Sequence, residues 1–262
     1  MLNNKNIVII GGTSGLGLSA AIAFVKQGAK VVAVGRNPET CRQAQEQLGS
    51  KGLIAVGDAS QENTASNAIE LCLKEWGSFH GLYHVAGGSG RKMGDGPLHE
   101  ITLEGWNKTL ELNLTSVMLS NRAAVKAFQK SKTGGTILNM SSVLGYSPAP
   151  TFFTTHTYAA AKAAIIGFSK SLAAYYAKDD IRINVIAPAL VETPMAQRAA
   201  TDAAIMDYIQ TKQPLDGGRI GRPKDLDGAA CFFMSDYSTF TTGQVLAVDG
   251  GWGVSEGQIK KG

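Results

Sequence analysis

The feature that most constrains the fold is a regular alternation of short apolar segments with longer segments of helical spacing. Seven apolar segments have the length of buried strands, at residues 6–10, 30–34, 53–56, 81–86, 136–140, 181–186 and 244–248. Helical patterns lie between them, at residues 15–27, 39–48, 62–76, 102–130, 157–177 and 224–234, and the long 102–130 segment is expected to break near Asn113. Strands separated by helices form parallel sheets with helices on both faces. The sequence therefore predicts a doubly wound α/β fold with a parallel seven-stranded sheet.

No linker, repeat or low-complexity stretch divides the chain, so we expect a single domain over residues 1–262. The composition, 44% hydrophobic and 18% charged, is typical of a globular protein rather than a disordered one. The net charge of +4 comes from scattered basic residues without a basic stripe, so nucleic acid is not an expected partner. No apolar run approaches the length of a membrane span, and the run at residues 7–10 is too short for a signal peptide.

The cysteines and histidines indicate neither a disulfide framework nor a metal site. Cys41, Cys72 and Cys231 are odd in number and far apart, which is typical of reduced thiols in the cytoplasm. His80 and His84 are four residues apart but run into a predicted strand, so no metal is expected. We therefore expect a cytoplasmic protein.

A glycine-rich turn, GGTSGLG at residues 11–17, joins the first predicted strand to the first helix. Glycine permits a tight turn and a close approach of the backbone, and the free N–H groups at a helix start bind phosphate. A purely structural turn is the alternative, but the position between strand and helix favours a nucleotide site. The spacing Gly-x-x-x-Gly-x-Gly differs from that of other dinucleotide binders. The turn predicts a Rossmann-type, dinucleotide-binding domain.

Two Tyr-x-x-x-Lys pairs occur, Tyr158 with Lys162 and Tyr208 with Lys212. Residues four apart lie on one helix face. A lysine cation about 4 Å from a phenolate contributes roughly 4 kcal/mol at an effective dielectric of about 20, or about three pKa units, which would make the tyrosine a better proton shuttle. An ordinary solvated helix face fits the same spacing, so the pattern by itself leaves both pairs open.

Together these motifs resemble the classical short-chain dehydrogenase/reductase family over essentially the whole chain. The matching positions, in chain order, are Gly11, Gly15, Gly17, Asp58, Ala86, Gly87, Asn113, Ser142, Tyr158 and Lys162. The resemblance places the active site at the start of the helix after the fifth strand. It therefore selects Tyr158 and Lys162, and it leaves Tyr208 and Lys212 in a variable surface region.

The resemblance implies an NAD(P)(H)-dependent oxidoreductase that interconverts a carbonyl and a secondary alcohol, with hydride from the nicotinamide and the proton through Tyr158. Ser142 would hydrogen-bond the reacting oxygen, Lys162 would bind the nicotinamide ribose, and Asn113 would hold a water in the proton path. The implied cofactor-binding residues are Gly11, Thr13, Ser14, Gly15, Leu16, Gly17, Arg36, Asp58, Ala59, Ala86, Gly87, Tyr158, Lys162, Pro188, Val191 and Thr193.

Two alternatives stay open. Ser141 is the rival of Ser142, although Val-Leu-Gly after Ser142 matches the family pattern. A nucleotide-binding regulatory or structural protein on the same fold is the rival of the enzyme, because a fold does not fix a function.

NADP(H) is the expected cofactor, with NAD(H) possible. Gly35 stands where NAD-selective proteins of this class carry an acidic residue, and Arg36 follows it. A guanidinium pairs well with a 2′-phosphate. Ser14 occupies the position where many NADP-binding relatives carry a second basic residue, so we expect modest discrimination.

The chain departs from the family pattern at three places and in one loop. Ile10 replaces a Thr, His84 and Val85 replace two Asn, and Ala189 replaces a Gly. At the first two places we expect altered packing rather than lost catalysis, and Ala189 is expected to restrict the backbone near the nicotinamide. The loop at residues 146–157 is three residues longer than is common in the family.

The expected partners are a small carbonyl or alcohol substrate and further copies of the chain. Tyr146, Phe152 and Phe153 either line an apolar mouth or belong to the core, and Arg91 and Lys92 either attract an acidic substrate or are solvated. The helical segments 102–130 and 157–177 carry more apolar surface than one sheet face needs, and the family pairs such helices into dimers and tetramers. A homo-oligomer is therefore expected.

Overall fold

The protein is described by a computed structural model for residues 1–257, and the last five residues of the predicted domain lie outside the described part. Residues 1–257 form one seven-stranded sheet in the order β3-β2-β1-β4-β5-β6-β7, with every neighbouring pair parallel. The strands are β1 (Asn6–Ile10), β2 (Lys30–Gly35), β3 (Gly52–Val56), β4 (Gly81–His84), β5 (Gly135–Met140), β6 (Ile181–Pro188) and β7 (Val245–Val248). The predicted sheet is confirmed.

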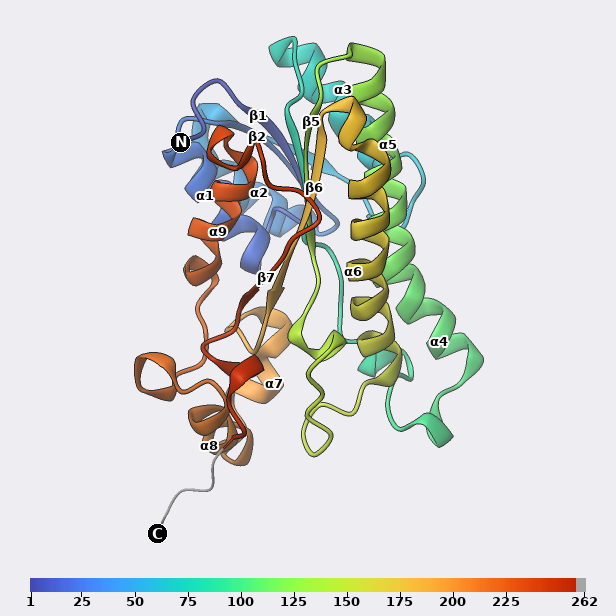
Figure 1. The fold of residues 1–262 in the computed structure, drawn as a ribbon, viewed down its shortest axis with the longest axis vertical. Coiled ribbons are helices and arrows are strands. Elements are labelled where there is room, and N and C mark those ends of the chain that lie inside the picture. Colours follow the sequence, from blue (N-terminus) through green and yellow to red (C-terminus); the bar gives the residue numbers. More distant parts are fainter. Residues whose placement is uncertain (258–262) are drawn as a thin grey trace.

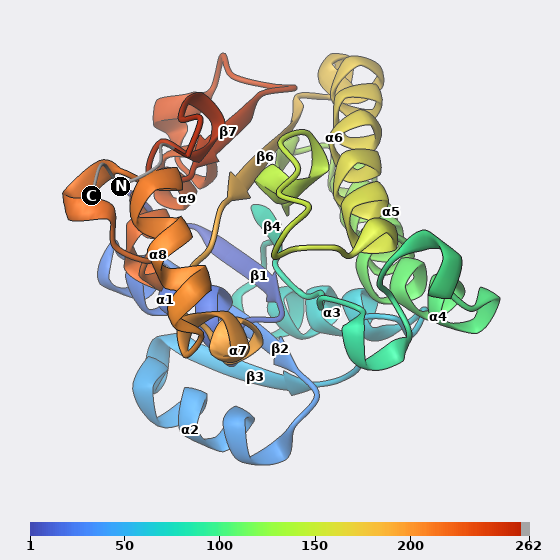
Figure 2. The ribbon, with the colours of Figure 1, turned by 90° about the horizontal axis from the view of Figure 1, so that it is seen from below.

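Helices cover both faces of the sheet (Figure 1). One face carries α1 (Gly15–Lys26), α2 (Pro38–Leu48) and α9 (Asp227–Met234), and the other carries α3 (Thr64–Trp76), α5 (Ser116–Ser131) and α6 (His156–Tyr176). The shorter helices α4 (Leu103–Leu110), α7 (Gln197–Ala200) and α8 (Ala203–Lys212) lie toward the carboxyl ends of the strands, the end that faces the viewer in Figure 2. None of the helices in residues 1–257 combines the length and the apolar character that a membrane crossing needs.

The central strands are mainly apolar because both of their faces are buried. In β1, Ile7 and Ile9 pack into a cluster with Phe24 of α1, whereas Val8 and Ile10 pack into a second cluster with α3 and α5. All five β1 residues are buried. The unbroken apolar run in the sequence is thus the consequence of a two-sided core.

The long helical segment is interrupted at the predicted place. A π-helical turn, Glu111–Thr115, separates α4 from α5 and holds Asn113. Single π turns inside helices occur frequently at functional sites.

Several predicted boundaries shift by a few residues. β4 ends at His84 rather than Ala86, because the N–H groups of Val85 and Ala86 both donate to the carbonyl of Ile10 and the chain leaves the sheet there. The segment predicted as a helix from residue 224 begins with a 3-10 turn, Pro223–Leu226, and becomes α-helical at Asp227.

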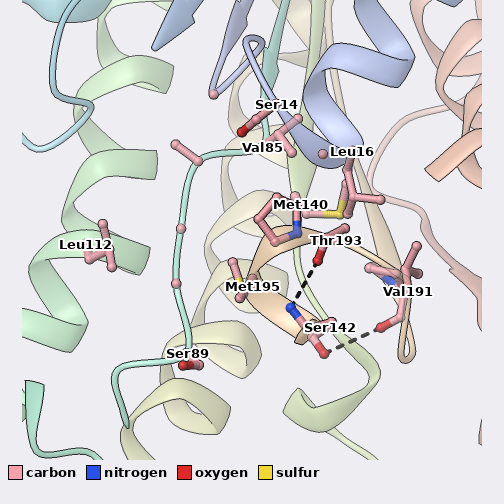
Figure 3. A pocket seen from close by; sticks show the side chains of 18 of the residues that line it. Ser14, Leu16, Val85, Ser89, Leu112, Met140, Ser142, Val191, Thr193 and Met195 are labelled. Atoms are coloured by element: carbon pink, nitrogen blue, oxygen red, sulfur yellow. Dashed lines mark hydrogen bonds between the residues drawn. The ribbon is translucent and has the colours of Figure 1, made fainter. Parts of the chain in front are cut away.

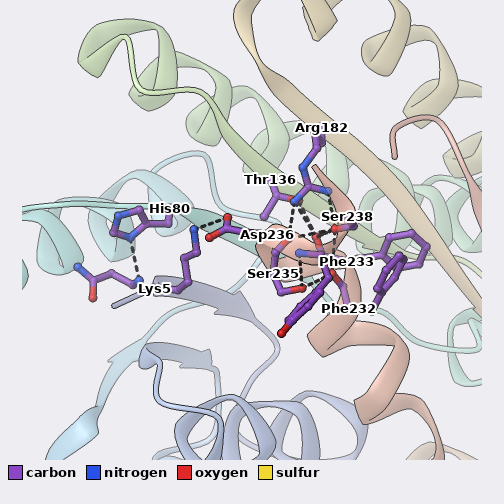
Figure 4. Close-up of polar contacts among 11 residues, drawn as sticks. Lys5, His80, Thr136, Arg182, Phe232, Phe233, Ser235, Asp236 and Ser238 are labelled. Carbon is purple, nitrogen blue, oxygen red and sulfur yellow. Dashed lines mark hydrogen bonds and ion pairs between the residues drawn. The ribbon is translucent and has the colours of Figure 1, made fainter. Parts of the chain in front are cut away.

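A partly buried polar cluster fixes the end of α9 to the amino end of the sheet, opposite the carboxyl ends of the strands (Figure 4). Arg182 of β6 donates to the carbonyls of Phe233 and Ser235 at 3.0 and 3.2 Å, and to Ser238 Oγ at 2.9 Å. A cation at a helix C-terminus complements the free carbonyls there. Lys5 Nζ pairs with Asp236 at 2.6 Å and ties the chain before β1 to the same corner. These contacts stabilise the amino end of the sheet.

Candidate active site

A cavity of about 490 Å³ opens at the carboxyl ends of the central strands. Its walls come from the start of α1 (Ser14, Leu16), the end of β5 (Met140, Ser142) and the segment after β6, as Figure 3 shows. Open α/β sheets bind ligands at this end, where the strand order reverses. In this sheet the reversal falls between β1 and β4.

Two glycines of the turn at the cavity, Gly11 and Gly17, have no room for a side chain. A Cβ on Gly11, whose φ is +86°, would lie 2.7 Å from the Ala86 nitrogen, and a Cβ on Gly17 would lie 2.0 Å from the Gly11 carbonyl oxygen. Ser14 is the N-cap of α1, and within residues 1–257 its side chain makes no capping hydrogen bond. The first N–H groups of α1 are thus available to an anionic group. This cradle fits the pyrophosphate of a dinucleotide.

At the end of β2, the Thr13 side chain fills the space that an acidic side chain at Gly35 would need. A Cβ on Gly35 would lie 1.9 Å from Thr13 Oγ1. Arg36 Nη1 lies 3.2 Å from Asp58 Oδ2, and 63% of the Arg36 side chain is exposed. Burial alone would raise the pKa of Asp58, but hydrogen bonds from Ser60 and the Arg36 guanidinium together hold it below the usual value. Arg36 is therefore positioned at the cavity but already bound to a carboxylate.

Tyr158 and Lys162 lie on one face of α6, and both line the cavity. Lys162 Nζ lies 5.4 Å from the centre of the Tyr158 ring and donates to the Met140 carbonyl at 3.0 Å. Burial lowers the pKa of Lys162 to about 8. Burial also raises the pKa of Tyr158, opposed by a hydrogen bond with Ser142. The expected acidification of the phenol is therefore wrong for this structure, because burial of the phenol itself dominates its pKa.

The two neighbouring serines have different partners. Ser141 Oγ is buried and donates to the Lys162 carbonyl at 2.7 Å, which commits its proton to the backbone of α6. Ser142 Oγ accepts the Leu144 N–H at 3.2 Å and donates to the Pro188 carbonyl through a long hydrogen bond of 3.4 Å, and its interaction with the phenol lowers the pKa of Tyr158. The geometry thus brings Ser142, rather than Ser141, to the phenol.

Asn113 lies directly behind the cavity wall rather than in it. Its amide donates to the Gly88 carbonyl and to the Thr109 carbonyl, both at 2.9 Å, and its oxygen accepts the Gly88 N–H at 3.1 Å. A Cβ on Gly87 would lie 2.7 Å from Asn113 Oδ1 and 3.5 Å from Lys162 Nζ. The π turn therefore points Asn113 at the loop after β4, next to the lysine.

His84, which replaces an Asn of the family pattern, forms hydrogen bonds at the start of the same loop. Its Nδ1 lies 2.7 Å from Ser120 Oγ and its Nε2 lies 3.1 Å from the Ala86 carbonyl oxygen. Because a carbonyl only accepts, we assign the proton to Nε2. Burial, and then the charge of Lys162, lower the pKa of His84 to about 3, so the ring is neutral. The departure at this position is accommodated by packing.

Sequence reasoning missed Asp95, which holds the start of α6. Asp95 is 5% exposed, and its two carboxylate oxygens accept the N–H groups of Thr157 and Tyr158 at 3.0 and 2.8 Å. A carboxylate at a helix N-terminus satisfies free donors and complements the helix dipole. No local motif in the sequence connects this loop residue to a helix so far along the chain.

The predicted cofactor residues line the cavity, except Gly17, which is buried beneath Gly11. Of the predicted aromatic mouth, Phe153 lines the cavity, whereas Tyr146 and Phe152 do not. Tyr208 is not a plain surface residue. It is half-buried against Phe152 and Trp252, at ring-centre distances of 5.1 and 5.8 Å. Further lining residues that the sequence did not indicate are Asn37, Thr40, Ser89, Leu112, Leu190, Met195, Arg198 and Trp252.

Comparison with known proteins gives consistent matches over nearly the whole chain. The family model described as enoyl-(acyl carrier protein) reductase matches residues 11–253. The chain is 35% identical over 255 residues to the 3-oxoacyl-[acyl-carrier-protein] reductase FabG of Chlamydia trachomatis, covering 96% of this chain and 98% of that protein. It is 32% identical over 247 residues to cis-4-hydroxycyclohexanecarboxylate dehydrogenase of Sinomonas cyclohexanicum, covering 94% and 95% of the two chains.

Solved structures of similar proteins match the fold of this chain. A short-chain type dehydrogenase/reductase from Mycobacterium ulcerans matches with a TM-score of 0.88 at 28% identity, covering 97% of this chain and 91% of that one. A 3-ketoacyl-(acyl-carrier-protein) reductase from Brucella melitensis, complexed with NADH, matches with a TM-score of 0.85 at 28% identity, covering 97% and 100%. Because sequence, sheet order and site position all agree, the chain belongs to the short-chain dehydrogenase/reductase family and is an NAD(P)-dependent oxidoreductase that interconverts carbonyls and alcohols.

Proposed function

We propose that the chain is an NADP(H)-preferring carbonyl reductase or alcohol dehydrogenase in which Tyr158 transfers the proton. The observation that carries this proposal is the meeting of three side chains at one cavity wall. Tyr158 and Ser142 line the same cavity, the Ser142 hydroxyl lowers the pKa of the phenol, and Lys162 Nζ lies 5.4 Å from the ring centre. A phenol, a hydroxyl and an ammonium group together supply a proton donor, a hydrogen bond to the reacting oxygen and a stabilising charge.

The residues around the cavity fit a dinucleotide along its length. We propose that the start of α1 and the glycine turn hold the pyrophosphate, that Asp58 and Ala59 lie near the adenine, and that Arg36 faces the 2′-phosphate. The nicotinamide end is assigned to Lys162 and to the segment after β6, with Pro188, Val191 and Thr193. The bound cofactor supplies the hydride, which is the step that amino acid side chains cannot provide.

In the reducing direction, the chain's own groups handle the proton. Burial keeps the Tyr158 hydroxyl protonated at neutral pH, so it is available as the donor to the carbonyl oxygen. Ser142 Oγ hydrogen-bonds the same oxygen and holds the carbonyl in place. The ammonium of Lys162 stabilises the phenolate that remains after the transfer. Asn113 fixes the loop behind Lys162, through its hydrogen bonds to Gly88, and so keeps these groups aligned.

The test of this function is a panel of ketones, aldehydes and secondary alcohols, followed at the absorbance of the reduced nicotinamide with each cofactor. We expect turnover that depends on Tyr158. The absence of turnover across the panel, with the cofactor bound, would favour a nucleotide-binding protein without catalysis.

We also propose that the protein acts in the cytoplasm as a homo-oligomer, a dimer or a tetramer. The cysteines Cys41, Cys72 and Cys231 are buried free thiols, which suits a reducing compartment. The outer face of α6 exposes small residues, and a Cβ on Gly167 would meet no atom within 4 Å. Such a face permits close helix packing between copies. Light scattering should give a mass above the 27.5 kDa of one chain.

A further inference from the structure

Two arginines converge on one wall of the cavity that holds Tyr158. Arg91 follows β4 in a short 3-10 turn, and Arg198 belongs to α7. Arg91 Nη2 donates to the carbonyl oxygen of Phe152 at 3.2 Å, and Arg198 Nη2 donates to the same oxygen at 3.4 Å. Both arginines line the cavity. Two segments distant in the sequence therefore bring two cations to one point of the site.

These charges are only partly balanced by the protein nearby. Among residues 1–257, neither guanidinium forms an ion pair, and the carbonyl of Phe152 is the acceptor that they share. Asp95 is the acid that stabilises the charge of Arg91, but both of its oxygens accept N–H groups of α6. Burial, and then the charge of Arg198, lower the pKa of Arg91. Arg91 is partly buried and Arg198 is exposed at the cavity, and the repulsion between two such like charges is relieved when an anion joins them.

The wall beside the arginines is apolar. Phe153, Met195 and Trp252 line the same cavity, and Phe153 packs edge-on against Trp252 at a ring-centre distance of 5.9 Å. The long 146–157 loop supplies both Phe153 and the Phe152 carbonyl. Its extra residues thus shape the substrate side of the cavity.

We propose that the substrate is a carbonyl compound, or the corresponding alcohol, that carries a carboxylate, and that Arg91 and Arg198 bind this carboxylate. The inference rests on the proposed function, because it names the substrate class of the same site. A guanidinium presents parallel N–H donors that match the two oxygens of a carboxylate. The apolar wall of Phe153 and Met195 suits a hydrocarbon body between the carboxylate and the reacting carbonyl.

The experiment compares oxo acids with their neutral methyl esters. The panel holds 4-oxocyclohexanecarboxylate and linear oxo acids of increasing length, each beside its ester. We expect the native protein to reduce at least one acid with a higher kcat/KM than its ester. Arg91→Met and Arg198→Met should each lower the kcat/KM for that acid about 10- to 100-fold, mostly through KM, since a hydrogen-bonded charge pair is lost. Turnover of the ester should remain near the native value.

Lys92→Met is the matched control, because Lys92 is an exposed cation next to Arg91 that does not line the cavity. It should leave the acid and the ester unchanged. The proposal is overturned if every ester is reduced as well as its acid, if the arginine variants affect acid and ester equally, or if Lys92→Met reproduces their effect.

A binding measurement separates this proposal from the proposed function. Calorimetry should detect cyclohexanecarboxylate, but not cyclohexanecarboxamide, binding to the native protein, and Arg198→Met should weaken the binding of the acid. Binding of the acid without turnover of any carbonyl compound would support the carboxylate site and contradict the proposed function. Turnover of neutral ketones without binding of the acid would support the proposed function and contradict the carboxylate site.

Discussion

The carboxylate of Asp95, in the loop after β4, accepts the backbone N–H of Tyr158 at 2.8 Å. Its second contact is the N–H of Thr157 at 3.0 Å, so Asp95 holds the first turn of α6 at the place where the phenol projects into the cavity. The same loop carries Arg91. The position of the proton donor and the proposed carboxylate site are therefore linked through one loop.

Replacing Asp95 should lower the rate more than it weakens cofactor binding. Asp95→Ala removes both contacts to α6, and a displaced phenol should reduce kcat about 10- to 100-fold. The loss of a helix cap should also lower the free energy of unfolding by about 1–2 kcal/mol. Steady-state kinetics, urea unfolding and a titration of NADPH measure the three effects.

The control is Asp202→Ala, which removes the corresponding cap of α8, where Asp202 accepts the N–H groups of Ala204 and Ile205. It should cost similar stability and leave kcat near the native value. An equal loss of kcat in the two variants would show that Asp95 acts only through stability.

The two serines should differ strongly. Ser142→Ala removes the hydroxyl beside Tyr158 and should lower kcat about 100-fold, as expected for a hydrogen bond that strengthens in the transition state. Ser141→Ala removes a hydrogen bond to the Lys162 carbonyl and should mainly reduce stability. The opposite order of kcat values would move the catalytic hydroxyl by one residue.

Carbonyl reduction should decline as the pH rises through about 8. Reduction requires a protonated Tyr158 and the charge of Lys162, and burial raises the pKa of Tyr158 while it lowers the pKa of Lys162 to about 8. Lys162 therefore loses its proton first, and kcat/KM for reduction should fall on the alkaline side. Alcohol oxidation needs the phenolate, and because burial raises the pKa of Tyr158, its rate should rise only at a higher pH than the decline in reduction.

Lys162→Arg tests the assignment, because a guanidinium stays charged throughout this range. The decline near pH 8 should move to higher pH in any residual activity of this variant. A profile with the same midpoint in both proteins would contradict the role of Lys162.

Cofactor choice should depend on the pair formed by Arg36 and Asp58. Arg36→Ala should lower kcat/KM for NADPH about tenfold, equivalent to about 1.4 kcal/mol, and should change the value for NADH little. Asp58→Asn removes the carboxylate that occupies Arg36 at 3.2 Å and should strengthen the preference for NADPH. A native preference for NADH, or no loss of NADPH efficiency in Arg36→Ala, would refute the assignment.

The sequence predicted those features that depend on local pattern. Mainly apolar runs such as residues 6–10 predicted the strands, because a strand buried on both faces is mainly apolar. The long helical segment was expected to break near Asn113, a residue that is unfavourable inside a helix, and the structure has a π turn there.

Features that depend on tertiary contacts were not predictable in this way. Asp95 contacts Thr157 and Tyr158 of α6, which lie 62 and 63 positions further along the chain, and no local residue pattern predicts such a contact. The direction of the Tyr158 pKa was wrong because spacing gives the distance to a charge but not the extent of burial. Tyr208 was placed at the surface because its packing against Trp252 appears only when the chain is folded.

Turnover by Tyr158→Phe tests the central claim most directly. The variant keeps the ring in its place and removes only the hydroxyl, so the kcat for carbonyl reduction should fall by about 100- to 10,000-fold while the dissociation constant for NADPH stays near the native value. A variant that binds NADPH normally and still reduces carbonyl compounds at close to the native rate would contradict proton transfer through Tyr158.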